Sequence, residues 1–477
     1  MKFLQSVFFI GLALLVFACQ NKKEEVFDYQ NYLSQGKFKE AEIRLNELIS
    51  DDPQNEQLAI QLETIHRLRK EFPYTRADVK EQLSEYFPDL TDDDLNQWEN
   101  ARQLEMRVID GEKRYFSRSV SNFFRLNEAA GKIKEEKNGK AYDGVEDFQQ
   151  TVIPQWFEKP IEPRNPFVPQ RIKVDYTITL DANAVPAGEL VKCWLPYPRT
   201  GSQRLPRVEF LEASQEEYII APNETMQRTV YMEKKAVQDE ATVFQISYVF
   251  ETAAQWFDIK PEDVQGYDKN SELYKKYTAE RLPHIVFNDQ IKSLAKNIVG
   301  DEKNPVKQVE LLYYWINDNI PWAGALEYSV MPCIPCYVLE NMHGDCGMQT
   351  FLFLSMARSL GIPCKWQSGW YLLPQTKNLH DWAEVYYEGV GWVPVDPSFK
   401  LIDSEDKRIK EFYLNGLDCY RLVVNDDFAR ELVPPKKYYR SEPFDFQRGE
   451  LEWEGGNLYF DTWDYHLDFE YLPATEN

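Results

Sequence analysis

The spacing of apolar residues changes along the chain and divides it into four segments. Between residues 31 and 153 apolar positions recur every three or four residues, which predicts amphipathic helices. Residues 165–258 alternate between apolar and polar positions in short runs separated by Pro, Gly and Asn, which predicts the strands of a small β-sandwich. Residues 261–400 return to helical spacing and then to strand-like runs, and 401–477 contain short aromatic strands. We therefore expect an α+β protein.

The most regular pattern lies between residues 341 and 400. Gly-Asp-Cys-Gly at 344–347 precedes apolar residues at helical spacing, and Gly361–Pro363 ends the helix because Gly accepts the left-handed cap and Pro cannot continue the turn. Cys346 therefore begins a helix. The unpaired N–H groups and the helix dipole at such a position favour an anion, so we expect the pKa of its thiol to be lowered.

Two strand-like runs, 380–387 and 391–396, follow this helix and are separated by a turn rich in Gly. His380 opens the first run and Asp396 closes the second, so a hairpin brings both to the same end. Beside Cys346 they complete a set of thiol, imidazole and carboxylate. In such a set Cys346 attacks a carbonyl, His380 takes and returns the proton, and Asp396 orients the imidazole.

These motifs occur together in a known family. The GDC sequence followed by a helix and GIP, the H-x-W-x-E motif that begins at His380, and GWVPVDPS resemble the core of the transglutaminase-like superfamily. The superfamily includes transglutaminases, peptide N-glycanases and bacterial thiol peptidases. The resemblance implies a papain-like transglutaminase core over 261–400, with Cys346, His380 and Asp396 at the catalytic positions. The calcium pattern of animal transglutaminases is not recognisable.

Three further residues are candidates for the cleft. Trp322 precedes the nucleophile in the sequence NIPWAG, and its indole N–H is a pure donor that could stabilise an oxyanion beside the backbone N–H of Cys346. Packing in the core is the alternative role for Trp322. His343 could line the cleft or be an ordinary loop histidine. Trp382 is expected to support the site by packing and hydrogen bonding.

The first residues have the pattern of an export signal. Residues 1–18 contain a lysine, a long apolar run and a small residue before Cys19, which indicates a secretory signal peptide. Ala18 followed by Cys19 resembles a bacterial lipobox, so cleavage would leave Cys19 lipidated and joined to the protein by a tether, residues 19–30. A plain secretory or uncleaved signal is the alternative. We expect an exported protein anchored by lipid in the bacterial envelope, at the outer membrane and facing the periplasm or the surface.

Charge and composition limit the classes of partner and cofactor that are expected. The chain has 54 basic and 78 acidic residues and a net charge of −24, which repels nucleic acid, so no nucleic-acid partner is expected. Its five histidines include no HxH or HxxxH pair, and we expect neither a metal nor another cofactor. A peptide or protein substrate is the expected partner besides the membrane. The sequence does not determine the oligomeric state.

The remaining cysteines leave one pairing open. Cys333 and Cys336 form a CxxC sequence upstream of the nucleophile, and no second pair follows at zinc spacing. A disulfide and two free thiols are both compatible with an exported protein.

The expected function is thiol-dependent acyl transfer on an amide of a peptide or protein, through a Cys-His-Asp triad and a thioester. Hydrolysis is favoured because no recognisable feature selects an amine over abundant water. Amide cross-linking of the transglutaminase type is one alternative. A binding or assembly module whose triad is vestigial is another.

Overall fold

A computed structural model describes residues 31–473, so the expected signal peptide and Cys19 lie outside the described residues. The chain divides into two compact units, one up to Gly139 and one from Lys140 onward. No helix within residues 31–473 is both long and apolar enough to cross a membrane.

The first unit is mainly helical. Several short helices each contribute one face to its apolar core, in which Val79, Leu83 and Leu95 are fully buried. Thr91 begins one of them with a capping box, since its hydroxyl accepts from Asp94 N–H and the Asp94 carboxylate accepts from Thr91 N–H. The elements are α2 (Phe38–Asp51), α3 (Glu56–Glu71), β1 (Tyr74–Thr75), α4 (Arg76–Ser84), α5 (Asp92–Asn100), β2 (Met106–Ile109), β3 (Glu112–Tyr115), α6 (Ser119–Leu126) and α7 (Glu128–Asn138).

The second unit contains two five-stranded sheets that form the β-domain. One has the order β13-β9-β4-β17, with β6 also paired to β9, and the other has the order β16-β15-β5-β8-β7. Alternate residues of β4, such as Ile172, Val174 and Tyr176, are fully buried, as period-two patterning requires. The strands are β4 (Pro166–Leu180), β5 (Leu190–Pro196), β6 (Val208–Ala213), β7 (Tyr218–Ile220), β8 (Thr229–Lys235), β9 (Thr242–Trp256), β13 (Gly416–Leu417), β15 (Glu450–Trp453), β16 (Gly456–Leu458) and β17 (Trp463–Leu472).

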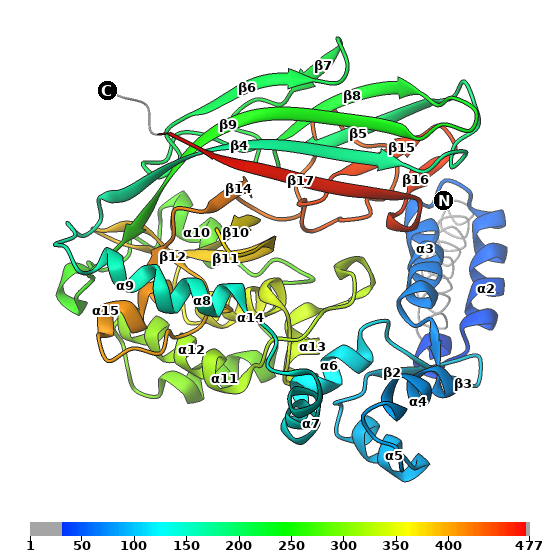
Figure 1. The fold of residues 1–477 in the computed structure, drawn as a ribbon, viewed down its shortest axis with the longest axis horizontal. Helices are drawn as coiled ribbons and strands as arrows, with labels where there is room; N and C mark the ends of the chain where they lie inside the picture. The colour runs from blue at the N-terminus through cyan, green and yellow to red at the C-terminus, as the bar shows by residue number, and fades with distance from the viewer. Residues whose placement is uncertain (1–30, 474–477) are drawn as a thin grey trace, which may run out of the picture. The chain divides into compact units, whose positions relative to one another are not determined.

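The C-terminal strands complete the sheets of this β-domain. β17 runs antiparallel to β4 from the pair Trp463↔Leu180 to the pair Leu472↔Arg171, and β15 pairs with β5 (Figure 1). The sequence pattern identifies strands in both regions. It does not identify these partners, because strand pairing between distant segments depends on tertiary packing rather than on local alternation.

The remaining part of the second unit is a mixed core built on a four-stranded sheet of order β12-β11-β10-β14. In Figure 1 this sheet lies between the β-domain and the helices α11 and α12. Helix α14 is buried along its length, from Cys346 to Arg358. The elements are α8 (Gly144–Thr151), α9 (Ile153–Trp156), α10 (Glu272–Thr278), α11 (Asp289–Val299), α12 (Pro305–Asn319), α13 (Ile334–Asn341), α14 (Cys346–Ser359), β10 (Cys364–Leu372), β11 (Lys377–Tyr387), β12 (Gly391–Val395), α15 (Lys407–Lys410) and β14 (Arg421–Asn425).

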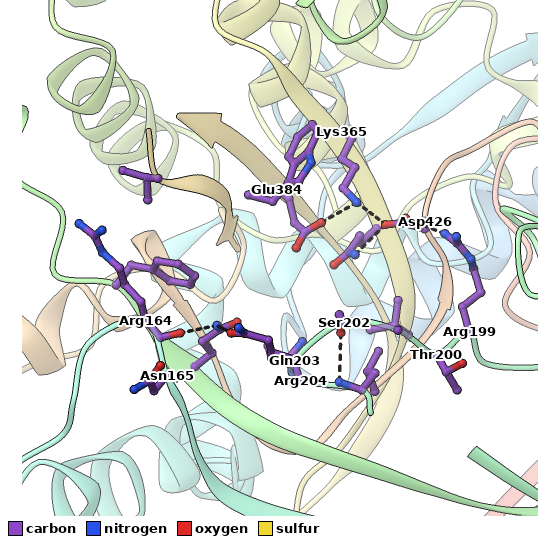
Figure 2. A pocket seen from close by; sticks show the side chains of 18 residues that line it. Arg164, Asn165, Arg199, Thr200, Ser202, Gln203, Arg204, Lys365, Glu384 and Asp426 are labelled. Carbon is purple, nitrogen blue, oxygen red and sulfur yellow. Dashed lines mark hydrogen bonds and ion pairs between the residues drawn. The ribbon is translucent and has the colours of Figure 1, made fainter. Parts of the chain in front are cut away.

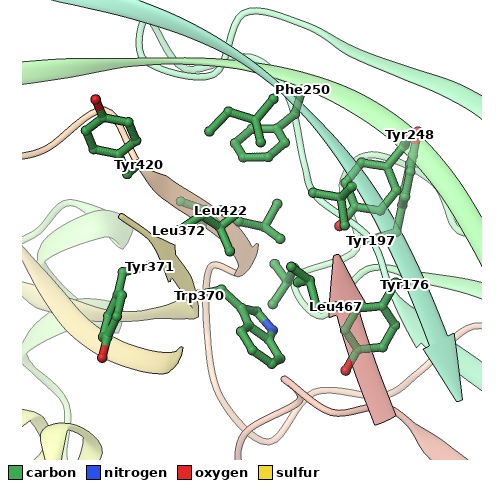
Figure 3. Close-up of a cluster of buried hydrophobic side chains, with 14 of the residues drawn as sticks. Tyr176, Tyr197, Tyr248, Phe250, Trp370, Tyr371, Leu372, Tyr420, Leu422 and Leu467 are labelled. Atoms are coloured by element: carbon green, nitrogen blue, oxygen red, sulfur yellow. The ribbon is translucent and has the colours of Figure 1, made fainter. Parts of the chain in front are cut away.

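One apolar cluster joins the β-domain to this core. Tyr176 of β4 meets Trp370 of β10 edge to face, with ring centroids 6.2 Å apart, and Leu422 of β14 and Leu467 of β17 belong to the same cluster (Figure 3). The β-domain and the core sheet therefore share a hydrophobic interior, and burial of this shared surface holds them together.

Candidate active site

Cys346 is the first residue of α14, as the sequence predicts. Asp345 caps the helix by accepting from Met348 N–H at 3.0 Å, and Tyr328 donates its hydroxyl to the same carboxylate oxygen at 2.7 Å. Gly347 permits this arrangement, because a Cβ there would lie 2.1 Å from the Tyr328 hydroxyl oxygen. The side chain next to the thiol is thus kept small so that Tyr328 can reach the cap.

His380 and Asp396 lie together, as the predicted hairpin requires. β11 pairs with β12 in antiparallel register, and Asp396 directly follows β12. The Nε2 atom of His380 lies 2.7 Å from Oδ2 of Asp396, and the two side chains are 4% and 0% exposed. The hairpin therefore forms a buried imidazole–carboxylate pair.

Arg421 of β14 stabilises the charge of Asp396. Its Nη1 donates to Oδ2 of Asp396 at 2.9 Å, its Nε donates to Asp418 at 2.7 Å, and all three side chains are fully buried. Burial alone would raise the pKa of Asp396, but His380 and Arg421 outweigh it and lower that pKa to about 2. Sequence analysis missed Arg421. The available signal was a charged residue at the start of the apolar run RLVVN.

Aromatic rings hold the imidazole in place. His380 contacts Tyr371 and Phe399, with ring centroids 5.5 and 4.4 Å away, and lies nearly parallel to Trp382. Burial is the main influence on the pKa of His380 and lowers it, while the charge of Asp396 acts in the opposite direction. Trp382 donates its Nε1–H to Gln367 at 2.9 Å. This bond and the packing fit the supporting role expected for Trp382.

The thiol of Cys346 is engaged elsewhere. Its Sγ donates to Oδ2 of Asp381 at 3.2 Å. Consecutive strand residues point to opposite faces, so Asp381 faces away from His380 and toward α14, where Trp366 stacks on Phe351. Within residues 31–473 no hydrogen bond joins Cys346 to His380. The structure thus brings the imidazole and carboxylate together and attaches the thiol to the adjoining strand residue.

This environment raises the pKa of the thiol, which is the opposite of the expected effect of the helix N-terminus. Burial is the main cause, and the negative charges of Asp381 and Asp345 add to it, so the pKa of Cys346 lies well above its ordinary value. Burial and Asp445 likewise raise the pKa of Asp381 well above its usual range, and the pKa of Asp445 is raised to about 7. Desolvation and nearby carboxyl groups therefore outweigh the helix dipole.

A segment near the C-terminus supplies part of this environment. Asp445 accepts from Ser368 Oγ at 2.5 Å, and Gln447 donates through Nε2 to Oδ1 of Asp381 at 2.9 Å. The same amide of Gln447 donates to the backbone carbonyls of Gly369 and His380. Sequence analysis missed both residues, because no local pattern links positions so far apart.

Trp322 and His343 differ in their suitability for the cleft. Trp322 forms a parallel bridge with Gly344, and Gly344 N–H donates to Pro321 O at 3.2 Å, so Trp322 lies beside the loop that leads to Cys346. His343 is 4% exposed and packs edge-on against the ring of Tyr337. Burial lowers the pKa of His343 to about 4. Its surroundings are those of a buried core histidine.

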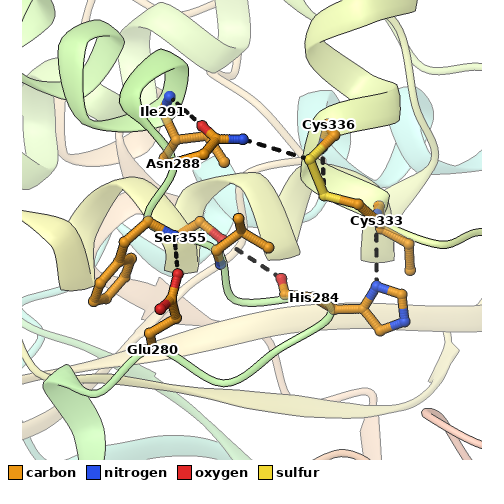
Figure 4. Close-up of a disulfide and its surroundings, with 10 residues drawn as sticks. Glu280, His284, Asn288, Ile291, Cys333, Cys336 and Ser355 are labelled. Atoms are coloured by element: carbon orange, nitrogen blue, oxygen red, sulfur yellow. Dashed lines mark hydrogen bonds between the residues drawn. A yellow bond between two sulfur atoms is a disulfide. The ribbon is translucent and has the colours of Figure 1, made fainter. Parts of the chain in front are cut away.

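Cys333 and Cys336 form a disulfide at the start of α13 (Figure 4). Cys333 Sγ accepts from Cys336 N–H and caps the helix, and Nδ1 of the buried His284 accepts from Ile334 N–H at 3.3 Å. Of the two states left open by the sequence, the structure therefore has the cross-linked one. Among the described residues, no group of three or more His, Cys, Asp or Glu side chains could hold a metal ion.

Comparison with known proteins identifies similarity in the same region. Residues 292–397 match the model of the transglutaminase-like superfamily. An uncharacterised protein of Haemophilus influenzae is 26% identical over 278 residues, which cover 50% of this chain and 72% of the relative.

Solved structures also align with the chain. A candidate cysteine protease from Cytophaga hutchinsonii aligns at 13% identity over 65% of this chain and 93% of its own, with a TM-score of 0.42. The periplasmic domain of TgpA from Pseudomonas aeruginosa aligns at 14% identity over 57% of this chain and 96% of its own, with a TM-score of 0.24.

Proposed function

We propose that the chain is a cysteine-dependent enzyme that transfers the acyl group of an amide, because residues 292–397 match the model of the transglutaminase-like superfamily. One observation carries the proposal. The Cys346 thiol bonds to Asp381, and His380, the residue directly before Asp381, bonds to Asp396. All three groups of the expected triad therefore lie within one small region of the core.

The reaction assigns one task to each group. When the thiol exchanges Asp381 for His380, it meets Nδ1, the ring nitrogen that Asp396 does not engage. His380 takes the thiol proton, and the thiolate adds to the amide carbonyl. Collapse of the tetrahedral intermediate breaks the C–N bond, while the imidazolium gives its proton to the leaving amine. A thioester on Cys346 remains.

Water completes the reaction. His380 takes a proton from water, the hydroxide adds to the thioester carbonyl, and the carboxylic acid leaves as Cys346 regains its proton. The backbone N–H of Cys346 and the indole of Trp322 are the proposed oxyanion donors. Asp396, whose pKa of about 2 keeps it ionised, fixes the ring orientation and balances the imidazolium charge.

The proposed substrate is a peptide or protein, and the proposed acceptor is water. An amine acceptor would give transglutaminase-type cross-linking with the same first half-reaction. Incubation with a peptide substrate and a dansyl-labelled amine separates the two, because cross-linking incorporates the label into the peptide and hydrolysis releases a free carboxylate. We retain export and lipid attachment at Cys19 as parts of this proposal.

A second candidate function has its own support. The resting thiol bonds to Asp381 rather than to His380, and its pKa is raised. Such an unreactive thiol is compatible with a non-catalytic binding or assembly module whose triad is vestigial. The reactivity of the Cys346 thiol therefore distinguishes the two candidate functions.

The test is alkylation of the purified protein with iodoacetamide from roughly pH 5 to pH 9, followed for each cysteine by mass spectrometry. An active site predicts that Cys346 is alkylated faster than the buried Cys193, Cys364 and Cys419, and that His380→Ala removes the difference. Equal labelling of all four cysteines would exclude the enzyme and favour the binding module. Melting temperatures of the variant and the parent show whether the substitution acts on folding instead.

A further inference from the structure

A cavity of about 540 Å³ lies between the β-domain and the core sheet of the second unit (Figure 2). Its β-domain wall comes from residues 164–165 and from the loop 199–205, and its other wall includes Gln367, Glu384 and Trp392 of the core sheet. Among the residues described, Cys346, His380 and Asp396 are not part of its lining. The cavity is thus separate from the candidate active site.

The lining is rich in cations although the chain as a whole carries a net charge of −24. Two of these cations are balanced by carboxylates within the cavity wall. Lys365 bonds to Asp426 at 2.7 Å and to Glu384 at 2.8 Å, and Arg199 bonds to Asp426 at 2.6 Å. The charges of these four side chains balance one another.

Arg204 is different, because only neutral groups bind it. Its Nε donates to Ala253 O at 3.0 Å and its Nη2 donates to Asp418 O at 2.9 Å. The residue is only 7% exposed, and no carboxylate forms an ion pair with it in the described part of the chain. Burial lowers the pKa of Arg204 to about 10. The carboxylates of Asp418 and Glu384 act on this charge only from beyond ion-pair distance, so the buried cation is incompletely balanced, and an anion in the cavity would offset the cost.

Arg164 lines the same wall. It pairs with Asp263 at 3.0 Å, a residue outside the lining, and its side chain is 42% exposed. Its charge is balanced, so Arg204 is the cation of the cavity lining that has no ion pair among the described residues. A guanidinium presents a planar fork of donors that matches a carboxylate.

The rest of the wall fits an organic ligand rather than a bare inorganic ion. The apolar side chains of Leu205, Phe257, Val390, Trp392 and Val423 line the cavity together with several amides. Apolar walls with a few polar groups are typical of sites that bind small organic molecules.

We propose that this cavity binds the carboxylate group of an organic ligand, with Arg204 as the buried counter-charge. The carboxylate could belong to a free small acid or to the C-terminus of a peptide, and the chemistry of recognition is the same. This site stands apart from the thiol chemistry, so Cys346→Ala should bind the ligand as the parent does.

Isothermal titration calorimetry of the purified protein tests the site with three probes: glutarate, tri-alanine and tri-alanine amide. Saturable binding of glutarate identifies a free acid, and saturable binding of tri-alanine with at least tenfold weaker binding of its amide identifies a peptide C-terminus. Absence of binding by both acids at millimolar concentration, or equal affinity for tri-alanine and its amide, would overturn the proposal.

Gln203→Glu supplies a matched variant. Gln203 is exposed, lines the cavity and accepts from Gln255 Nε2, an acceptor role that Glu retains. The added negative charge should weaken binding of the acid by about tenfold. The control Gln238→Glu makes the same change on an exposed turn outside the lining and should leave binding unchanged. Equal affinity in both variants would contradict the assignment.

Discussion

The thiol of Cys346 donates its hydrogen bond to Asp381, the residue that directly follows His380. Strand alternation places these two neighbours on opposite faces of β11, so one strand position carries the imidazole and the next holds the thiol. The bond to Asp381 keeps the thiol protonated. Activation of the candidate site therefore depends on releasing Cys346 from Asp381.

Replacing Asp381 with Asn should lower the apparent pKa of the Cys346 thiol. The substitution keeps the shape of the side chain but removes a carboxyl group whose hydrogen bond, and whose negative charge at a pH where it is ionised, raise that pKa. Each pKa unit of decrease gives about ten times more thiolate at a pH below the pKa. The pH profile of iodoacetamide labelling at Cys346 measures the shift. Asp468→Asn, on the exposed side of β17, is the control, and an unchanged midpoint for Asp381→Asn would refute the effect.

Replacing Arg421 with Met should destabilise the protein by about 3–5 kcal/mol, because it leaves the carboxylates of Asp396 and Asp418 buried without their partner. Urea unfolding followed by tryptophan fluorescence measures the change. The matched control is Arg408→Met, which breaks the exposed ion pair with Asp406 and should cost less than about 1 kcal/mol. Similar losses in the two variants would show that the Asp396 network contributes little to folding.

Stability should fall as the pH decreases below the ordinary histidine pKa. Burial lowers the pKa of His284 to about 3 and of His343 to about 4, so between those values and about 6.5 the unfolded chain binds protons that the folded chain does not. Within this pH range the free energy of unfolding decreases as the pH falls, by about 1.4 kcal/mol per pH unit for each histidine.

Urea unfolding of the parent and His284→Gln at pH 6 and pH 5 measures this dependence. Gln keeps an acceptor for Ile334 N–H but does not titrate in this range. The variant should lose less stability between the two pH values than the parent does. Equal losses would mean that His284 is accessible to protons in the folded state.

The disulfide should contribute about 2 kcal/mol to stability, the chain-entropy value for a very short loop. The double variant Cys333→Ser and Cys336→Ser removes the cross-link while a serine hydroxyl at 333 can still cap α13. Urea unfolding compares it with the parent. Dithiothreitol should destabilise the parent and leave the variant unaffected; a variant as stable as the oxidised parent would disprove the contribution.

Local patterns were sufficient for the parts of the site that are close in sequence. The start of α14 at Cys346 follows from its flanking glycines and apolar spacing, and the contact between His380 and Asp396 follows from the hairpin. The two-residue period of the same hairpin also separates Asp381 from His380. It does not reveal which face α14 covers, so the partner of the thiol was not predictable.

The parts of the site and fold that the sequence did not predict depend on contacts between distant segments. Arg421, Asp445 and Gln447 reach the site from the region after the core, and β17 completes a sheet begun by β4. Burial of the thiol in the folded core also reverses the expected direction of its pKa shift. Neither the partners nor the desolvation is encoded in a local window of the sequence.

The pairing of β4 with β17 also sets an order of events during synthesis. A ribosome makes the chain from the N-terminus, so β4 exists long before its neighbour, and its open edge can meet the edges of other chains in the meantime. Asp445 and Gln447 are likewise made after Cys346 and Asp381. The nascent chain therefore passes through a stage in which Cys346 and Asp381 are present and Asp445 is not yet in place.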